Sequence, residues 1–248
     1  VLFRSQHKNT IRMNTYVLIH GAWHGAWCWT KIISLLEEQG HKVITPNLPG
    51  HGHDETPTEN VTLQSYTDVI CEILDSLDES VILVGHSMGG LVISQVAEYR
   101  PLKIKQLIYI AAYVLKNEGT ILSNLIKDSE SMLIKNIDFK TERTEVRIIQ
   151  DEIKEIFYGD CSDLDITFAK SFITNQSIGP IKTRLVLNEE KFNQIPKKYI
   201  ECLNDNAISI NMQRKMYSEF SFDVIHSLNS SHSPFFSSPI ELVSLIIN

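Results

Sequence analysis

The sequence predicts an α/β fold with a mostly parallel sheet, helices on both faces of the sheet and an inserted helical cap. Two observations carry this prediction. Short β-branched runs alternate with amphipathic helical patterns, and the alternation lapses once, in a charged stretch in the middle of the chain. With 248 residues, of which 43% are hydrophobic and 21% charged, the chain is long enough for one such domain to bury a sizeable core.

Six runs rich in β-branched and aromatic residues indicate strands, at residues 16–20, 43–47, 81–85, 107–111, 199–203 and 224–228. Apolar residues spaced three to four apart indicate helices at 29–39, 63–77, 89–99 and 239–247. Strands that alternate with helices form a parallel sheet, and these helices are expected to cover both of its faces.

The alternation lapses between residues 113 and 194, where charged residues rise and short helical pieces are expected at 148–157 and 164–174. We therefore expect a cap at 113–194, inserted into a core made of residues 13–112 and 195–248. Residues 1–12 are polar and basic, and we expect them to be a non-native or disordered extension before Met13.

Composition argues against several classes of partner. The net charge is −7, and the 23 Lys and Arg residues are scattered, so no basic stripe for nucleic acid is evident. The longest apolar stretches are far shorter than the roughly 20 residues that cross a bilayer. Four widely spaced cysteines fit reduced thiols in a cytoplasmic protein better than disulfides or a zinc site. A monomer or a homodimer is expected.

The segment Gly85-His86-Ser87-Met88-Gly89 matches the pattern G-x-S-x-G. A buried strand precedes it and a helix follows it, as this motif requires when the serine is a nucleophile on a tight turn. The turn leaves room only for glycine on either side of the serine. The N–H group of Met88 would then point to the place where a substrate oxyanion forms.

A serine hydroxyl needs a base to remove its proton, and the motif predicts the chain order Ser, acid, His. Asp205 and His232 follow the last two predicted strands, at the sheet edge that also carries Ser87. His232 lies in a polar loop, Ser-Ser-His-Ser-Pro, without the periodicity of a buried element. The competing acids are Asp223, which begins a strand, and Asp160 in the cap.

A second oxyanion donor is expected from the loop after the first strand, and Ala22 N–H is the candidate. This loop could equally be a simple turn with Trp23 packed beneath it. Aromatic residues are candidates for an apolar pocket above Ser87, in particular Trp23, Phe157 and Tyr158; the remaining members of the set are Phe139, Phe168, Phe172 and Phe192. Ordinary packing of the cap is an equally good explanation for any one of them.

No cofactor or metal is expected. His51, His53 and Asp54 partly match a metal-binding cluster, but the Asp follows the second His directly and the final His is missing. A loop explains them better. No G-x-G-x-x-G follows the first strand, so a dinucleotide site is not predicted.

Several blocks of sequence resemble a family within the α/β-hydrolase fold: the plant methylesterases and hydroxynitrile lyases, with bacterial esterase relatives, some of which hydrolyse pyrethroids. These blocks are VLIHGAWHGAWCW, NLPGHGHDETP, ILVGHSMGG, YIECLNDNAIS and SHSPFFSSPIEL, and FYGDC at 157–161 resembles the cap of the bacterial branch. The resemblance implies a triad of Ser87, Asp205 and His232, with Ala22 and Met88 as oxyanion donors. It agrees with the choice made from the residues themselves.

The resemblance leaves three functions to weigh. A serine carboxylesterase acting on small, uncharged apolar esters through an acyl-enzyme is favoured. The lyases of the family carry Thr after the first-strand His and Lys after the catalytic His, where this chain has Gly21 and Ser233. Cyanide release would identify a lyase. A ligand-binding receptor on the same fold is a third alternative, and an intact triad argues against it.

Overall fold

The computed structural model describes residues 13–138 and 144–248. The expected extension at 1–12 and the candidate Phe139 lie outside these ranges. The main sheet has the strand order β2-β1-β3-β4-β8-β9, and every pairing in it is parallel. Its strands are β1 (Thr15–Ile19), β2 (Lys42–Ile44), β3 (Val81–His86), β4 (Ile104–Ile110), β8 (Lys197–Cys202) and β9 (Val224–Leu228). All six strands were predicted from the sequence.

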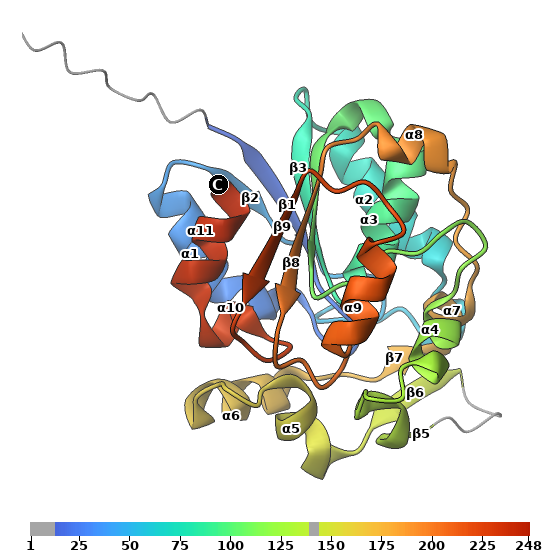
Figure 1. Cartoon of the computed structure of the whole chain (residues 1–248), viewed down its shortest axis with the longest axis vertical. Helices are drawn as coiled ribbons and strands as arrows, with labels where there is room; N and C mark the ends of the chain where they lie inside the picture. The colour runs from blue at the N-terminus through green and yellow to red at the C-terminus, as the bar shows by residue number, and fades with distance from the viewer. Residues whose placement is uncertain (1–12, 139–143) are drawn as a thin grey trace, which may run out of the picture.

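Helices cover both faces of this sheet, as the periodicity predicted (Figure 1). On one face lie α1 (Thr30–Glu38) and α11 (Pro239–Ile247), which contact each other. The other face is covered by α2 (Leu63–Asp75), α3 (Gly89–Tyr99) and α9 (Ile210–Tyr217), of which α9 was not predicted from the sequence. Strands β1 and β3 are completely buried because helices lie on both sides of them, which explains their continuous apolar runs.

The segment between β4 and β8 differs from the rest in architecture. Helices α5 (Ile153–Phe157) and α6 (Asp163–Phe172) lie around the carboxyl ends of β8 and β9 (Figure 1). They overlap the ranges 148–157 and 164–174, where short helical pieces were expected. Three short strands form a separate antiparallel sheet that the sequence did not predict: β5 (Ile137–Asp138), β6 (Glu145–Ile148) and β7 (Gln176–Ser177). Strands of two to four residues are too short for an alternating pattern to reveal them.

The remaining helices are short and connect these layers. They are α4 (Ile121–Lys127), α7 (Ile178–Lys182), α8 (Glu189–Asn193) and α10 (Pro234–Ser237), with 3₁₀ turns η1 (Ala26–Trp29), η2 (Thr58–Asn60), η3 (Pro101–Lys103), η4 (Leu133–Lys135) and η5 (Gln150–Glu152). Helix α8 contacts α3 and leads the chain back to the start of β8. None of the helices in the described ranges is long and apolar enough to cross a membrane.

The register of the sheet determines which loops meet. Cys202 of β8 pairs with Leu228 of β9, so the two strands end side by side. Asp205 follows three residues after the first of these positions, and His232 four residues after the second. Ser87 follows β3 directly, at the same edge of the sheet, because all strands run in one direction. The topology therefore brings the three predicted residues to one edge.

Candidate active site

Ser87 occupies a strained turn between β3 and α3. Its φ of 54° is in the left-handed region, which a non-glycine residue adopts only when its surroundings hold it there. The Ser87 N–H donates to the carbonyl of Ile110 (3.2 Å), and the Ser87 carbonyl accepts from the N–H of Tyr113 (3.0 Å). Ser87 is partly exposed, whereas His86 and Met88 beside it are buried. The turn presents one hydroxyl at the edge of the sheet.

Close approach of the backbone explains the glycines around this turn. A Cβ atom on Gly85 would lie 2.6 Å from the carbonyl oxygen of Gly89, and one on Gly89 would lie 2.6 Å from that of Ile19. Contacts this short are not tolerated, so neither position accepts a side chain without a shift of the backbone. The G-x-S-x-G spacing thus reflects the geometry of the turn.

Asp205 and His232 form a buried hydrogen-bonded pair. The distance from His232 Nδ1 to Asp205 Oδ2 is 2.7 Å, and the side chains are 1% and 0% exposed. Since a carboxylate only accepts, Nδ1 carries a proton, and a ring protonated at Nδ1 alone keeps Nε2 as an acceptor. This is the tautomer that a general base for a serine hydroxyl requires. The hydrogen bonds of the described residues do not include one between Ser87 Oγ and His232; in free enzymes such bonds often tighten only on substrate binding.

Backbone and amide donors hold the carboxylate of Asp205 in place. Its Oδ1 accepts from the N–H groups of Ala207 (2.7 Å) and Ile208 (2.9 Å), and its Oδ2 accepts from Gln213 Nε2 (3.1 Å). These three hydrogen bonds fix the orientation of the carboxylate. Gln213 on α9 was not identified from the sequence, where it is one polar residue in an amphipathic helix.

His86 supports His232 from behind the turn. Its Nε2 donates to the carbonyl of His232 at 2.7 Å, and the two rings are 4.6 Å apart. Burial lowers the pKa of His86 well below the usual value, and His232 nearby lowers it further. His86 is therefore a neutral hydrogen-bond donor behind the serine turn.

The loop after β1 lies directly against the serine turn. A Cβ atom on Gly21 would be 2.8 Å from Ser87 Cβ, so the backbone of this loop touches the nucleophile. Within the ranges that the structure describes, no protein group accepts a hydrogen bond from the N–H of Ala22 or of Met88. Two unused N–H donors near one hydroxyl are what an oxyanion hole requires.

Trp23 anchors this loop to the cap. Its backbone has a φ of 62°, its Nε1 donates to the carbonyl of Val146 in β6 (3.0 Å), and its carbonyl accepts from Thr174 N–H (3.1 Å). Its ring lies 5.8 Å from that of Phe157. The indole therefore connects the site to the cap.

His24 also stabilises the oxyanion loop, and sequence reasoning missed it. Its Nδ1 donates to the carbonyl of Ala22 (2.8 Å), so its Nε2 accepts from the hydroxyl of Tyr158 (2.6 Å). Burial lowers the pKa of His24 to about 3, which keeps the ring neutral. The only hint in the sequence was the echo of His20-Gly-Ala-Trp23 in His24-Gly-Ala-Trp27.

The aromatic candidates occupy different places. Phe157 is buried with its ring 5.6 Å from that of His232, and Tyr158 is completely buried with its hydroxyl bonded to His24. Phe168 and Phe172 on α6 are 39% and 43% exposed and contact Trp27. The expectation for Phe192 was wrong: it lies in α8, where Phe220 and the ammonium of Lys197 contact its ring, because the chain returns there to the start of β8.

The competing acids do not contact the His232 ring. Asp223 precedes β9 at the opposite edge, where its Oδ2 accepts from Lys197 N–H (2.7 Å). Asp160 accepts from Ser231 N–H at 3.0 Å. His51 is buried with its ring bonded to the hydroxyl of Tyr66 (3.1 Å). The described part of the chain contains no group of three His, Cys, Asp or Glu side chains arranged to hold a metal ion.

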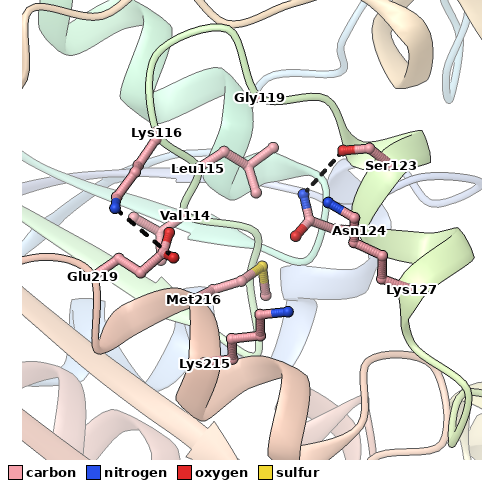
Figure 2. A pocket seen from close by; sticks show the side chains of 10 residues that line it. All are labelled: Val114, Leu115, Lys116, Gly119, Ser123, Asn124, Lys127, Lys215, Met216 and Glu219. Carbon is pink, nitrogen blue, oxygen red and sulfur yellow. Dashed lines mark hydrogen bonds and ion pairs between the residues drawn. The ribbon is translucent and has the colours of Figure 1, made fainter.

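A separate cavity of about 180 Å³ lies between the loop after β4, α4 and α9 (Figure 2). Leu115 and Met216 form its apolar lining, and Lys116 faces Glu219 at 3.8 Å. None of the predicted site residues lines this cavity, and its lining contains no histidine that could act as a base. It is distinct from the Ser87 site.

Residues 16–245 match the sequence profile of the α/β-hydrolase family. The chain is 31% identical to methylesterase 7 of Arabidopsis thaliana over 94% of each protein. It is 34% identical to a pyrethroid hydrolase of Sphingobium wenxiniae, over 93% of this chain and 85% of that protein. The chain spans 64% of the length of a longer chloroplastic relative from Arabidopsis thaliana, to which it is 30% identical.

Solved structures show the same likeness. The crystal structure of a pyrethroid hydrolase from Sphingobium faniae superposes with a TM-score of 0.85 at 30% identity, over 95% of this chain and 96% of that one. An Arabidopsis methylesterase superposes with a TM-score of 0.82 at 25% identity, over 94% of this chain and 96% of that one.

Proposed function

The chain belongs to the α/β-hydrolase family, and from this premise we propose that it is a serine carboxylesterase that uses Ser87, His232 and Asp205. The observation that carries the proposal is the buried His232–Asp205 hydrogen bond at the sheet edge where Ser87 lies on its strained turn. An acid that orients a histidine at the sheet edge that carries a partly exposed serine is the arrangement needed for acyl transfer.

In the proposed reaction, Ser87 Oγ attacks the ester carbonyl while His232 Nε2 takes its proton. The negative charge that forms on the carbonyl oxygen is stabilised by the N–H groups of Ala22 and Met88. His232 then gives the proton to the departing alcohol, and the acyl group stays on Ser87. A water molecule, deprotonated by the same histidine, releases the acid and restores the serine. Asp205 keeps the ring oriented and stabilises its protonated form.

We assign small, uncharged apolar esters as the substrate class. Phe157 and Trp23 are apolar groups beside His232 and the oxyanion loop, and none of the site residues above is a Lys or Arg that could clamp a phosphate. Among the relatives, the methylesterases are named for the cleavage of methyl esters and the pyrethroid hydrolase for the hydrolysis of pyrethroids.

The lyase alternative is less well supported by the geometry of the oxyanion loop. The lyases that the sequence resembles carry Thr at the position of Gly21, and here even a Cβ atom would lie 2.8 Å from Ser87 Cβ. Ser233 likewise stands where those lyases have Lys. A receptor function has no need for the aligned His232–Asp205 pair.

The test is removal of the nucleophile. Ser87→Ala should lower kcat for p-nitrophenyl acetate by about 10⁶-fold, while the circular dichroism spectrum stays unchanged. A fluorophosphonate should add once to the intact protein, at Ser87, and not to the variant. Across acetyl to palmitoyl esters, kcat/KM should peak at short or medium chains. Turnover by Ser87→Ala would contradict the mechanism, and a steady rise towards palmitoyl would contradict the substrate class.

A further inference from the structure

The turn between α5 and α6 packs against the loop that carries His232. The ring of Phe157 lies 5.6 Å from that of His232, and the thiol of Cys161 contacts the carbonyl of Ser233 at 3.8 Å. Between them, Asp160 contacts Ser231, the residue before His232. A short cap segment thus contacts three consecutive residues of the loop, namely the proposed base and the residue on either side of it.

Both hydrogen-bond donors of Ser231 are bonded to Asp160. The Ser231 N–H donates to Asp160 Oδ2 at 3.0 Å, and the Ser231 hydroxyl makes a short hydrogen bond to Oδ1. Ser231 is only 4% exposed, whereas Asp160 is on the surface. Hydrogen bonds from neutral donors to a carboxylate are of the stronger, charge-assisted kind. Without Asp160, a buried N–H and a buried hydroxyl would lose their partner.

Ser231 lies between two residues of the loop, Ser230 and His232, that hydrogen-bond to other parts of the protein core. On one side, the Ser230 carbonyl accepts from Asn204 N–H (3.0 Å). On the other side, the His232 carbonyl accepts from His86 and its ring bonds to Asp205. The loop lies between β9 and α10 and has no helical or strand hydrogen bonds of its own. The cap holds the two donors of Ser231, and its carbonyl accepts from the hydroxyl of Ser230 (3.0 Å).

The cap is itself tied down next to this turn. Lys31 of α1 pairs with Asp165 of α6 at 2.8 Å and also donates to the carbonyl of Phe236 in α10 (3.1 Å). The turn that carries Asp160 is therefore held between α10 and a tethered α6, and it can act as a fixed support.

We propose that Asp160 is a positioning residue of the hydrolase: by holding Ser231, it sets the ring of His232 for proton transfer with Ser87. The inference rests on the proposed function. Asp160 is not the acid of the triad, because its two oxygens are bonded to Ser231 while Asp205 bonds to the imidazole. The cap thus contributes to the alignment of the base.

Asp160→Ala, Asp160→Asn and Ser231→Ala test the proposal in the full chain. Asp160→Ala should lower kcat for p-nitrophenyl acetate by about 10- to 100-fold, the loss expected when a reacting group moves by a fraction of an ångström to 1 Å. KM should change by less than about twofold, because no substrate contact is removed. Asp160→Asn, which keeps one acceptor, and Ser231→Ala, which keeps the N–H contact, should lose less.

The matched control is Asp163→Ala, because the Asp163 side chain is 96% exposed and its contact is an ion pair with Lys154 at 3.6 Å. This variant should keep the kcat of the parent. Melting temperatures are measured for all variants, so that loss of folded protein is separated from loss of turnover.

A second readout does not depend on ester hydrolysis. The proton shared by His232 Nδ1 and Asp205 should give a far-downfield ¹H NMR signal, identified by its loss in Asp205→Asn. This signal should shift or broaden in Asp160→Ala and stay unchanged in Asp163→Ala. If Asp160→Ala keeps both the signal and kcat, or lowers only the melting temperature, or raises only KM, the positioning role is wrong. If the parent protein does not hydrolyse esters, the proposed function fails, and the NMR signal still decides whether Asp160 aligns His232.

Discussion

The neighbouring strands β8 and β9 carry a polar pair at each end. At their carboxyl end, Asp205 and His232 are joined by a 2.7 Å hydrogen bond. At their amino end, Asp223 Oδ2 accepts from Lys197 N–H, also at 2.7 Å, and the buried ammonium of Lys197 donates to the carbonyls of Phe192 (2.7 Å) and Ile195 (2.8 Å).

The difference between the two ends lies in which atoms remain available. The ammonium of Lys197 is enclosed by backbone acceptors and by the ring of Phe192, and it faces no nucleophile. Of the two ring nitrogens of His232, Asp205 bonds to Nδ1 alone, so Nε2 is left for the proposed proton transfer with the serine and the substrate. Burial and an acidic partner therefore do not distinguish a catalytic pair from a structural one. The proposed catalytic pair differs in having an unused ring nitrogen at the sheet edge that carries the strained Ser87.

The comparison is tested most severely by two matched substitutions, Asp205→Asn and Asp223→Asn. Asn at 205 removes the charge that orients and stabilises protonated His232, so kcat should fall by about 10⁴-fold. Asn at 223 can still accept from Lys197 N–H, and kcat should stay within about twofold of the parent. Steady-state kinetics on the same ester measure both. A crippled Asp223→Asn with an active Asp205→Asn would reverse the assignment of the two ends.

Buried histidines in the loops at the carboxyl edge of the main sheet should also make the fold less stable in acid. Burial lowers the pKa of His24 to about 3 and that of His51 to about 4, whereas an unfolded histidine titrates near 6.5. Below pH 6.5 the unfolded chain binds protons that the folded chain does not, so stability present above pH 6.5 is lost as the pH falls towards 4. At pH 5 the loss should reach up to about 2 kcal/mol for each of these histidines.

Urea unfolding at pH 7, 6 and 5 measures this loss. In His51→Gln, which keeps a polar partner for Tyr66, the decline between pH 7 and pH 5 should be smaller than in the parent. An equally steep decline in the variant would show that His51 does not contribute to acid sensitivity.

The smallest expected effect comes from the amino end. Burial lowers the pKa of Lys197 to about 8, partly opposed by the charge of Asp223, while an unfolded lysine titrates near 10.4. Above pH 8 the folded protein loses this proton while the unfolded chain still binds it. The free energy of unfolding should therefore increase between pH 7.5 and 9.5. We expect a gain on the order of 1 kcal/mol, since the two carbonyl acceptors stabilise the protonated form in the folded state.

Lys197→Met should lack this pH-dependent gain, whatever its absolute stability, and the difference in slope between the two proteins is the measurement. Identical slopes would mean that Lys197 stays protonated through this range. Its ammonium would then be better stabilised by the two carbonyls than its lowered pKa implies.

Much of this protein was determined by sequence features that act over a few residues. Six apolar runs, most of them followed or preceded by a helical pattern, were sufficient for the main sheet and for its parallel direction. The motif around Ser87 and the position of Asp205 and His232 after strands then placed all three at one edge, because parallel strands end together.

Only the tertiary structure decided how the site is supported. Gln213 on Asp205, His24 under Ala22 and Asp160 on Ser231 are contacts between residues 8, 2 and 71 positions apart, and in the sequence each is one polar residue among others. The small cap sheet and the place of Phe192 were hidden for a related reason. Strands of two to four residues carry no period, and an aromatic residue in a short helix does not show which end of the sheet the chain has reached. Local periodicity encodes elements, whereas partners across the fold depend on how those elements pack.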